Sequence, residues 1–364
     1  MVITKSKILQ FLSLFFSIAM ILISIVTAVL KLYTPKLLKN LDQICMLSSK
    51  LALPRLITIK HNMKKCNINY GEVNEISPLI ETKNKVENNQ NEFKQKNSNN
   101  FKVIETQFGA SGIKCGNFFV KNSTGKQIDF NSYLAKKPKI KIKNKKDPIV
   151  LILHTHTTEG YLDRDDGTVP ENFYPRTQDK NRNVVAVGEE IVKSLKNKNI
   201  NAIHDTTVHD YPSYSGSYSR SAKTVRENIK KYPSIQIVID IHRDSMGEKE
   251  TGRIKPTFKT KDGEKCAQIM FVIGCGFDGT FKNWEENLSF ALNIQSICEK
   301  KFPGLTRALT LKNAKYNQNL KPLKFQGKGS LISVLIEVGS DMSTTNECKK
   351  SGEMFAESLK AFIG

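Results

Sequence analysis

The sequence lacks any pair of cysteines at C-x-x-C spacing. Its seven cysteines are scattered along the chain: Cys45, Cys66, Cys115, Cys266, Cys275, Cys298 and Cys348. This spacing excludes a thiolate zinc site and a dense disulfide framework, so buried free thiols are the expected state. Histidine is also scarce, with six in 364 residues, and three of the six follow apolar runs. Any metal chemistry is therefore expected from imidazole and carboxylate ligands.

Acidic residues are few in the first part of the chain. Residues 1–148 hold 25 lysines and arginines against 9 acidic residues, whereas the remainder holds 31 against 26. The basic excess indicates attraction to an anionic surface, either membrane headgroups or wall polymers. A lysine-rich solvated surface is the simpler alternative. A nucleic-acid role is disfavoured, because the excess lies outside the main domain.

Charge is absent from residues 8–30, which are almost entirely apolar. A helix of this length rises about 35 Å, enough to cross the core of a bilayer. No clear A-x-A cleavage site follows, so we predict an uncleaved transmembrane anchor rather than a secretory signal, preceded by a short tail at 1–7. Lysines flank both ends of the span, and charge alone therefore leaves its orientation open.

The rest of the chain divides by composition. Residues 31–100 form a juxtamembrane segment and polar linker, 101–147 a small β-rich lead-in, and 148–364 the main domain. Within the domain, apolar runs alternate with amphipathic segments. We predict strands at 149–153, 201–204, 235–241, 268–273 and 330–336, and helices at 184–196, 221–231, 285–301 and near 352–362. This alternation predicts an α/β fold, with a mainly parallel twisted sheet flanked by helices.

Polar side chains follow three of these runs, where an open α/β sheet binds its ligands. VLIL leads into HTHTTE, IQIVID into IHRDS, and SVLI into EVGS. Strand alternation places His154 and His156 on one face. His/Glu sets are typical of zinc, and an open coordination position activates water with a spare glutamate as base. We expect three or four of His154, His156, Glu159 and His242 to converge on one ion.

Each of these residues also has a structural interpretation. A single histidine at a strand end is more often a satisfied structural group, and Glu337 could cap a helix beginning in SDMSTTNE. His204, His209 and Asp210 lie on or after another strand and are secondary candidates. His61 lies outside the domain.

Four motifs, HTHTTEGY, HDYPSYSGSYSRS, VIDIHRDS and LIEVGSDMSTTNE, occur in this order. Over roughly residues 100–364 the chain resembles the stage II sporulation protein P family, membrane-anchored cell-wall hydrolases of endospore formers related to zinc N-acetylmuramoyl-L-alanine amidases. The resemblance implies Zn²⁺, an amidase-like fold, and cleavage of the amide between N-acetylmuramic acid and L-alanine of peptidoglycan. It also implies septal wall thinning during engulfment, endopeptidase activity on cross-links, assembly with sporulation proteins D and M, and a single-pass protein with its domain outside the membrane.

The wider amidase pattern assigns the site residues. His242 matches the histidine of the later strand end and Glu337 the catalytic glutamate. The first histidine falls on His156 by its offset, with His154 as the alternative. No glutamate precedes the first helix, where the sequence reads TQDKNRN. The resemblance therefore leaves three alternatives: the carboxylate ligand is Glu159, it is Asp179, or the ligand shell differs from that of the related amidases, with Glu159 favoured.

Arg243 lies beside His242 and could bind a substrate carboxylate or serve a structural ion pair. A non-catalytic membrane-anchored scaffold that recruits other wall hydrolases is the alternative function, and such a scaffold is expected to lack stoichiometric zinc. Metal-dependent phosphoester hydrolysis normally needs more aspartate ligands than these motifs offer.

Overall fold

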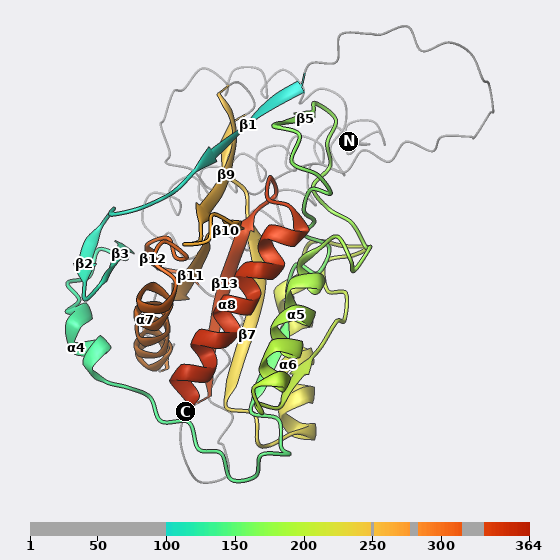
Figure 1. Ribbon diagram of the computed structural model, residues 1–364. Coiled ribbons are helices and arrows are strands. Elements are labelled where there is room, and N and C mark those ends of the chain that lie inside the picture. The colour runs from blue at the N-terminus through green and yellow to red at the C-terminus, as the bar shows by residue number, and fades with distance from the viewer. Residues whose placement is uncertain (1–99, 249–250, 277–282, 315–330) are drawn as a thin grey trace, which may run out of the picture. The chain divides into compact units, whose positions relative to one another are not determined.

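The computed structural model describes residues 100–248, 251–276, 283–314 and 331–364 (Figure 1). The predicted anchor at 8–30 and the predicted linker up to residue 99 lie outside this part of the chain. Within the described residues, no helix is both long and apolar enough to cross a bilayer. The five cysteines of this part, Cys115, Cys266, Cys275, Cys298 and Cys348, are buried free thiols, as expected.

The main sheet has eight strands in the order β2-β3-β12-β11-β13-β7-β4-β6. Their bounds are β2 Ile113–Cys115, β3 Phe118–Ser123, β12 Leu309–Lys312, β11 Ile269–Gly274, β13 Ile332–Ser340, β7 Ile237–Asp244, β4 Val150–Leu153 and β6 Ala202–His204. Parallel pairing dominates, as predicted; β11 runs antiparallel to β13, and β2 antiparallel to β3. The carboxyl ends of β13, β7 and β4 therefore lie at one edge of the sheet.

A second sheet, with strand order β10-β9-β1-β5 and β8 paired to β9, was not predicted. Its strands are β10 Lys265–Ala267, β9 Gly252–Lys259, β1 Asn100–Thr106, β5 Thr168–Pro170 and β8 Gly247–Glu248. The expected lead-in contributes to both sheets, because β1 pairs with β9 while β3 pairs with β12 and carries β2. A short helix, α4 (Phe130–Ala135), follows β3.

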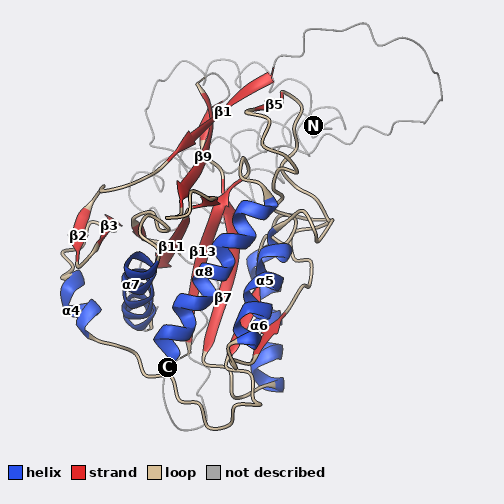
Figure 2. Ribbon diagram, in the orientation of Figure 1, coloured by secondary structure: helices blue, strands red, loops and turns tan. Residues whose placement is uncertain are grey.

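Helices cover both faces of the main sheet (Figure 2). They are α5 Val184–Asn197, α6 Ser217–Lys231, α7 Trp284–Lys301 and α8 Thr345–Ile363. Alternate residues of β4 separate the faces: Ile152 packs in the cluster shared by α5, α7 and α8, whereas Leu151 and Leu153 pack with Val225 and Ile229 of α6. Burial on both sides explains why the central strands read as continuous apolar runs.

Caps and pairing explain where the elements depart from the prediction. Helix α8 begins at Thr345, earlier than expected, because Thr344 and Glu347 form a capping box at its start. Glu337 therefore does not cap this helix. Strands β7 and β13 run further than predicted, since they remain paired through His242 and Glu337, so these two residues lie inside the sheet. Asn183 caps α5 by accepting from the Val185 N–H at 2.9 Å.

Candidate metal and catalytic site

His242 lies between two carboxylates. Its Nδ1 is 3.5 Å from Oε2 of Glu159, and its Nε2 is 3.1 Å from Oδ1 of Asp240. The contact of Nε2 with Asp240 is an ion-pair distance and lacks the geometry of a hydrogen bond. Burial opposes protonation of the ring, but the charges of Asp240 and Glu159 outweigh it and raise the pKa of His242 well above its usual value. The two carboxylates thus place negative charge on both sides of the His242 ring.

The separation of the two facing donors fits a shared ion. Ligand atoms at about 2.0–2.2 Å from a tetrahedral zinc are about 3.3–3.6 Å apart. The 3.5 Å between His242 Nδ1 and Glu159 Oε2 lies in this range. Asp240 is fixed behind the ring, accepting from Thr155 N at 2.8 Å and Thr155 Oγ1 at 2.6 Å. A carboxylate behind a histidine is the usual outer partner of a metal-ligating imidazole.

Glu159 is held by the loop that follows β4. Its Oε2 accepts from the Arg243 N–H at 3.1 Å, and Oε1 lies 3.7 Å from Arg176 Nη2. Burial opposes ionisation, but contact with His242 and the charge of Arg243 lower the pKa of Glu159. The alternative ligand Asp179 is exposed and accepts from the Asn181 N–H in a turn. The structure thus places Glu159 beside His242.

His156 lies next to His242, with ring centroids 5.2 Å apart. Its Nε2 is 3.0 Å from the Tyr214 hydroxyl, its Nδ1 is 3.4 Å from Ser217 Oγ, and the Tyr214 ring stacks on it at 4.5 Å. Burial lowers the pKa of His156 to about 4, so the ring is neutral, as a metal ligand must be. A metal at His156 would replace one of the two hydroxyl contacts.

His154 does not share this position, and the expected common face with His156 is wrong. Strand β4 ends at Leu153 and the chain turns immediately, so alternation no longer applies. The His154 Nδ1–H donates to the Ile241 carbonyl at 3.1 Å, and Nε2 lies 2.9 Å from His204 Nε2. Both rings pack against Gly188 of α5, where a Cβ atom would come within 2.8 Å of His154 Nε2. Both ring nitrogens of His154 are therefore engaged.

Glu337 is placed beside His242 by the parallel register of β13 and β7. It is half-buried, and its Oε2 has no hydrogen-bond partner in the structure. Burial and the charge of Asp244 raise the pKa of Glu337 to about 8. Arg307 pairs with Asp244 at 2.9 Å and offsets part of this shift. A carboxylate whose pKa lies near neutrality is suited to general base catalysis.

Arg243 adopts a buried position. Its side chain alternates away from that of His242 along β7, and its Nη2–H donates to the Pro175 carbonyl at 2.9 Å. With its backbone N–H bound to Glu159, the residue contributes to the shape of the site, and its role as a substrate ligand stays a prediction.

The secondary candidates support the loop that carries the site. Asp210 accepts from Thr158 Oγ1 at 2.7 Å and pairs with Arg176 at 2.7 Å. The His209 Nδ1–H donates to the His154 carbonyl at 2.7 Å. Both side chains are buried and thus fix the loop between His154 and Glu159.

One acidic cluster away from the strand ends resembles a metal site. Glu105, Asp165 and Glu347 form the one set in the described chain whose three donor atoms lie within 4.8 Å of one another. Lys255 occupies its centre, with Nζ 2.7 Å from Asp165, 2.8 Å from Glu347 and 3.4 Å from Glu105. The ammonium group supplies the compensating charge, so this cluster is an ion-pair network around a buried lysine.

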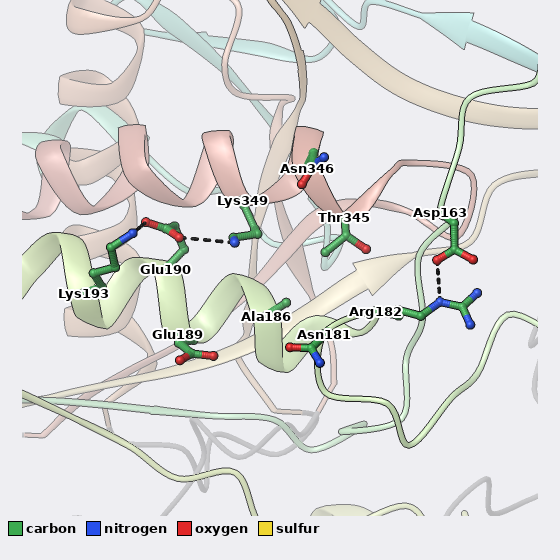
Figure 3. A pocket seen from close by; sticks show the side chains of 10 residues that line it. All are labelled: Asp163, Asn181, Arg182, Ala186, Glu189, Glu190, Lys193, Thr345, Asn346 and Lys349. Carbon is green, nitrogen blue, oxygen red and sulfur yellow. Dashed lines mark hydrogen bonds and ion pairs between the residues drawn. The ribbon is translucent and has the colours of Figure 1, made fainter.

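A pocket of about 400 Å³ lies between α5 and α8 (Figure 3). Five of its charged side chains are paired with one another: Glu190 lies between Lys193 and Lys349, and Arg182 points to Asp163. These helices cover the sheet face opposite to α6, whereas His156 contacts Ser217 at the start of α6. The pocket is therefore separate from the candidate site.

His156, Glu159, His242 and Glu337 are neighbours in the structure, although the donor atoms of His156, Glu159 and His242 do not all lie within 4.8 Å of one another. Two imidazoles and a carboxylate fit zinc, and the second carboxylate is left for proton transfer. Sequence reasoning did not assign Asp240, although its D-x-H spacing puts it on the same strand face as His242. It also did not assign Tyr214 or Arg176, which approach through long loops, and no local pattern places them.

Comparison with known proteins identifies a family. The family described as Stage II sporulation protein P matches residues 43–360. Stage II sporulation protein P of Bacillus subtilis (strain 168) is 32% identical over 183 residues, which cover 47% of this chain and 42% of that protein. The matched region thus spans less than half the length of this relative.

Solved structures give weaker similarities. N-acetylmuramoyl-L-alanine amidase AmiC2 of Nostoc punctiforme is 12% identical with a TM-score of 0.31, covering 60% of this chain and 96% of that chain. The CwlD amidase of Clostridioides difficile, solved with the GerS lipoprotein, is 13% identical with a TM-score of 0.30, covering 59% and 96%. At these TM-scores, the assignment of the chain rests on the family match.

Proposed function

The chain belongs to the stage II sporulation protein P family, and from this premise we propose that it is a zinc-dependent peptidoglycan hydrolase. The reaction is cleavage of the amide between N-acetylmuramic acid and L-alanine of the stem peptide. The observation that supports the proposal is that His242 lies beside both His156 and Glu159 at the carboxyl ends of β4 and β7, with Glu337 next to His242 on β13.

His156, Glu159 and His242 would hold the zinc ion. Zinc would supply Lewis acidity at the scissile carbonyl and a lower pKa for the attacking water. Asp240 orients the His242 ring from behind, and Arg243 and Arg176 fix the Glu159 carboxylate. The donor set thus has both its ligands and the partners that orient them.

Glu337 is the general base. Its carboxylate takes the proton of the attacking water and passes it to the departing amine of L-alanine. Burial favours its protonated form, whereas a nearby cation favours the carboxylate, so the pKa of Glu337, about 8 without an ion, would be lower beside a bound ion. Its buried Oε2 has no hydrogen-bond partner in the structure and would accept a hydrogen bond from the attacking water.

The biological setting is part of the proposal. Residues 8–30 anchor the protein in the cell membrane, and the domain faces the outer side, where peptidoglycan lies. There it thins the septal wall during engulfment in endospore formation, together with sporulation proteins D and M. Endopeptidase cleavage of peptide cross-links is a second activity of the same site.

Product analysis tests the activity. The purified full chain is incubated with purified peptidoglycan, and its zinc content is measured in the same preparation. The proposal predicts about one zinc per chain and the appearance of new L-alanine amino termini. New amino termini only within cross-links would make the protein an endopeptidase. Absence of zinc together with absence of any amide cleavage would favour a scaffold that recruits other hydrolases.

A further inference from the structure

Exposed aromatic side chains gather beside the candidate site. Large apolar or aromatic side chains are exposed at five positions of the described chain: Ile113, Ile142, Tyr174, Tyr211 and Tyr214. The three tyrosines are 72%, 57% and 39% exposed and come from two loops. Exposed aromatic groups confined to one region indicate a binding surface.

The two loops are joined to each other and to the site. Arg176 Nη1 pairs with Asp210 at 2.7 Å, and the Arg176 guanidinium lies over the Tyr214 ring at 4.8 Å. Tyr174 precedes Arg176 by two residues, and Tyr211 directly follows Asp210. Tyr214 stacks on His156 at 4.5 Å. Tyr214 therefore adjoins the candidate metal ligands, and Tyr174 and Tyr211 lie in sequence within two residues of the Arg176–Asp210 pair. We call these three exposed tyrosines the tyrosine rim.

We infer that this tyrosine rim, Tyr174, Tyr211 and Tyr214, binds the N-acetylated sugar rings of the glycan strand that carries the cleaved peptide; this inference rests on the proposed function. A tyrosine combines an apolar ring face with a hydroxyl edge, which matches the C–H faces and hydroxyl edges of a pyranose. The Asp210 side chain has no exposed surface and is paired with Arg176. The Arg176–Asp210 pair therefore adds no unpaired charge to the rim, and this favours an uncharged sugar over a charged peptide as the ligand.

The rim is fixed before a ligand arrives. The Arg220 guanidinium donates to the Ser215 carbonyl at 3.1 Å and to the His209 carbonyl at 2.6 Å. Asp210 binds both Thr158 and Arg176, which ties the tyrosine loop to the loop after β4. A fixed loop loses less conformational entropy on binding, so exposed rings here can contribute to affinity.

Calorimetric titration of the purified full chain tests the inference with two probes, peptide-free glycan strands and a free stem peptide. Wild-type protein should bind the strands. Tyr174→Ala and Tyr211→Ala should each weaken strand binding at least about fivefold, the usual effect of truncating an aromatic anchor. Tyr174→Phe and Tyr211→Phe should stay within about twofold, because the ring is retained. Binding of the free peptide should not change in any of the four variants.

Ile142→Ala is the matched control. Ile142 is exposed but adjoins Lys141, whose N–H donates to Gln236 next to the start of β7, at the opposite edge of the sheet. Wild-type strand affinity in the two alanine variants, equal loss for strands and peptide, or no strand binding by wild-type protein would each overturn the inference. Tyrosine-dependent strand binding without hydrolysis would overturn the proposed function alone, whereas hydrolysis with tyrosine-independent binding would overturn the inference alone.

Discussion

Asp240→Asn tests how much the carboxylate behind His242 contributes to metal binding. Asp240 Oδ1 lies 3.1 Å from His242 Nε2, and the two carboxylate oxygens accept from Thr155 at 2.8 and 2.6 Å. Asparagine keeps the shape and an oxygen for Thr155 but removes the negative charge beside the imidazole. Loss of such an outer partner weakens metal binding about 10- to 100-fold, or about 1.4–2.8 kcal/mol. We expect the zinc Kd of the variant to rise by this factor while the fold is retained.

Competition with a chromophoric chelator measures the zinc Kd, and far-ultraviolet circular dichroism checks the fold. Asp244→Asn is the matched control, because Asp244 ends the same strand but pairs with Arg307 at 2.9 Å. Its zinc Kd should stay within about twofold of wild type, since no ligand loses its outer partner. An Asp240→Asn protein with wild-type zinc affinity would refute the role of Asp240, and equal weakening in both variants would show only a general effect of charge.

Three further outcomes are expected. Lys255→Met leaves Asp165 and Glu347 without their buried cation and should lower the free energy of unfolding in urea by about 3–5 kcal/mol. Its control, Lys265→Met, changes a side chain that is 35% exposed and should cost less than about 1 kcal/mol. Equal effects of the two substitutions would contradict this prediction. Burial, with the neighbouring His204, lowers the pKa of His154 to about 3, below its unfolded value of about 6.5. The stability that depends on a neutral His154 is therefore fully present above about pH 6.5 and is lost as the pH falls toward 3, by up to about 1.4 kcal/mol per pH unit. His154→Gln should flatten this dependence of the unfolding free energy on pH. An unchanged dependence would refute the lowered pKa of His154. Removal of zinc by a chelator should abolish hydrolysis and lower the Tm, and adding zinc back should restore both. The Tm falls because an ion present at 100 times its Kd stabilises the fold by about 2.7 kcal/mol. An unchanged Tm would contradict a bound ion.

The central strands could be predicted from the sequence because both of their faces are buried. Runs such as 149–153 contain no polar residue, and amphipathic helices follow at the expected positions. The second sheet could not be predicted, since its strand β1 pairs with segments far away in the sequence. Val103 of β1 finds its partner in Arg253 of β9, and no local pattern encodes such a register.

The site could be predicted in part, for a related reason. His242 and Glu337 follow apolar runs of neighbouring strands, and parallel register brings them together without further information. The choice between His154 and His156 depends on the residue at which β4 ends, and strand ends are poorly specified by hydrophobic pattern. The contact of Tyr214 with His156 depends on the path of a loop, which only tertiary packing determines.

The most direct test of the catalytic assignment is a paired measurement on Glu337→Gln and His242→Ala. Zinc content and release of peptide from muramyl-peptide strands are measured for both, with Glu189→Gln on the exposed surface of α5 as control. Glu337→Gln should keep the fold and the zinc but lose about 100- to 10,000-fold in hydrolysis, because glutamine cannot accept the proton. His242→Ala should lose zinc and activity together, because it removes a ligand. Near-normal turnover in Glu337→Gln, or full zinc in His242→Ala, would contradict the account.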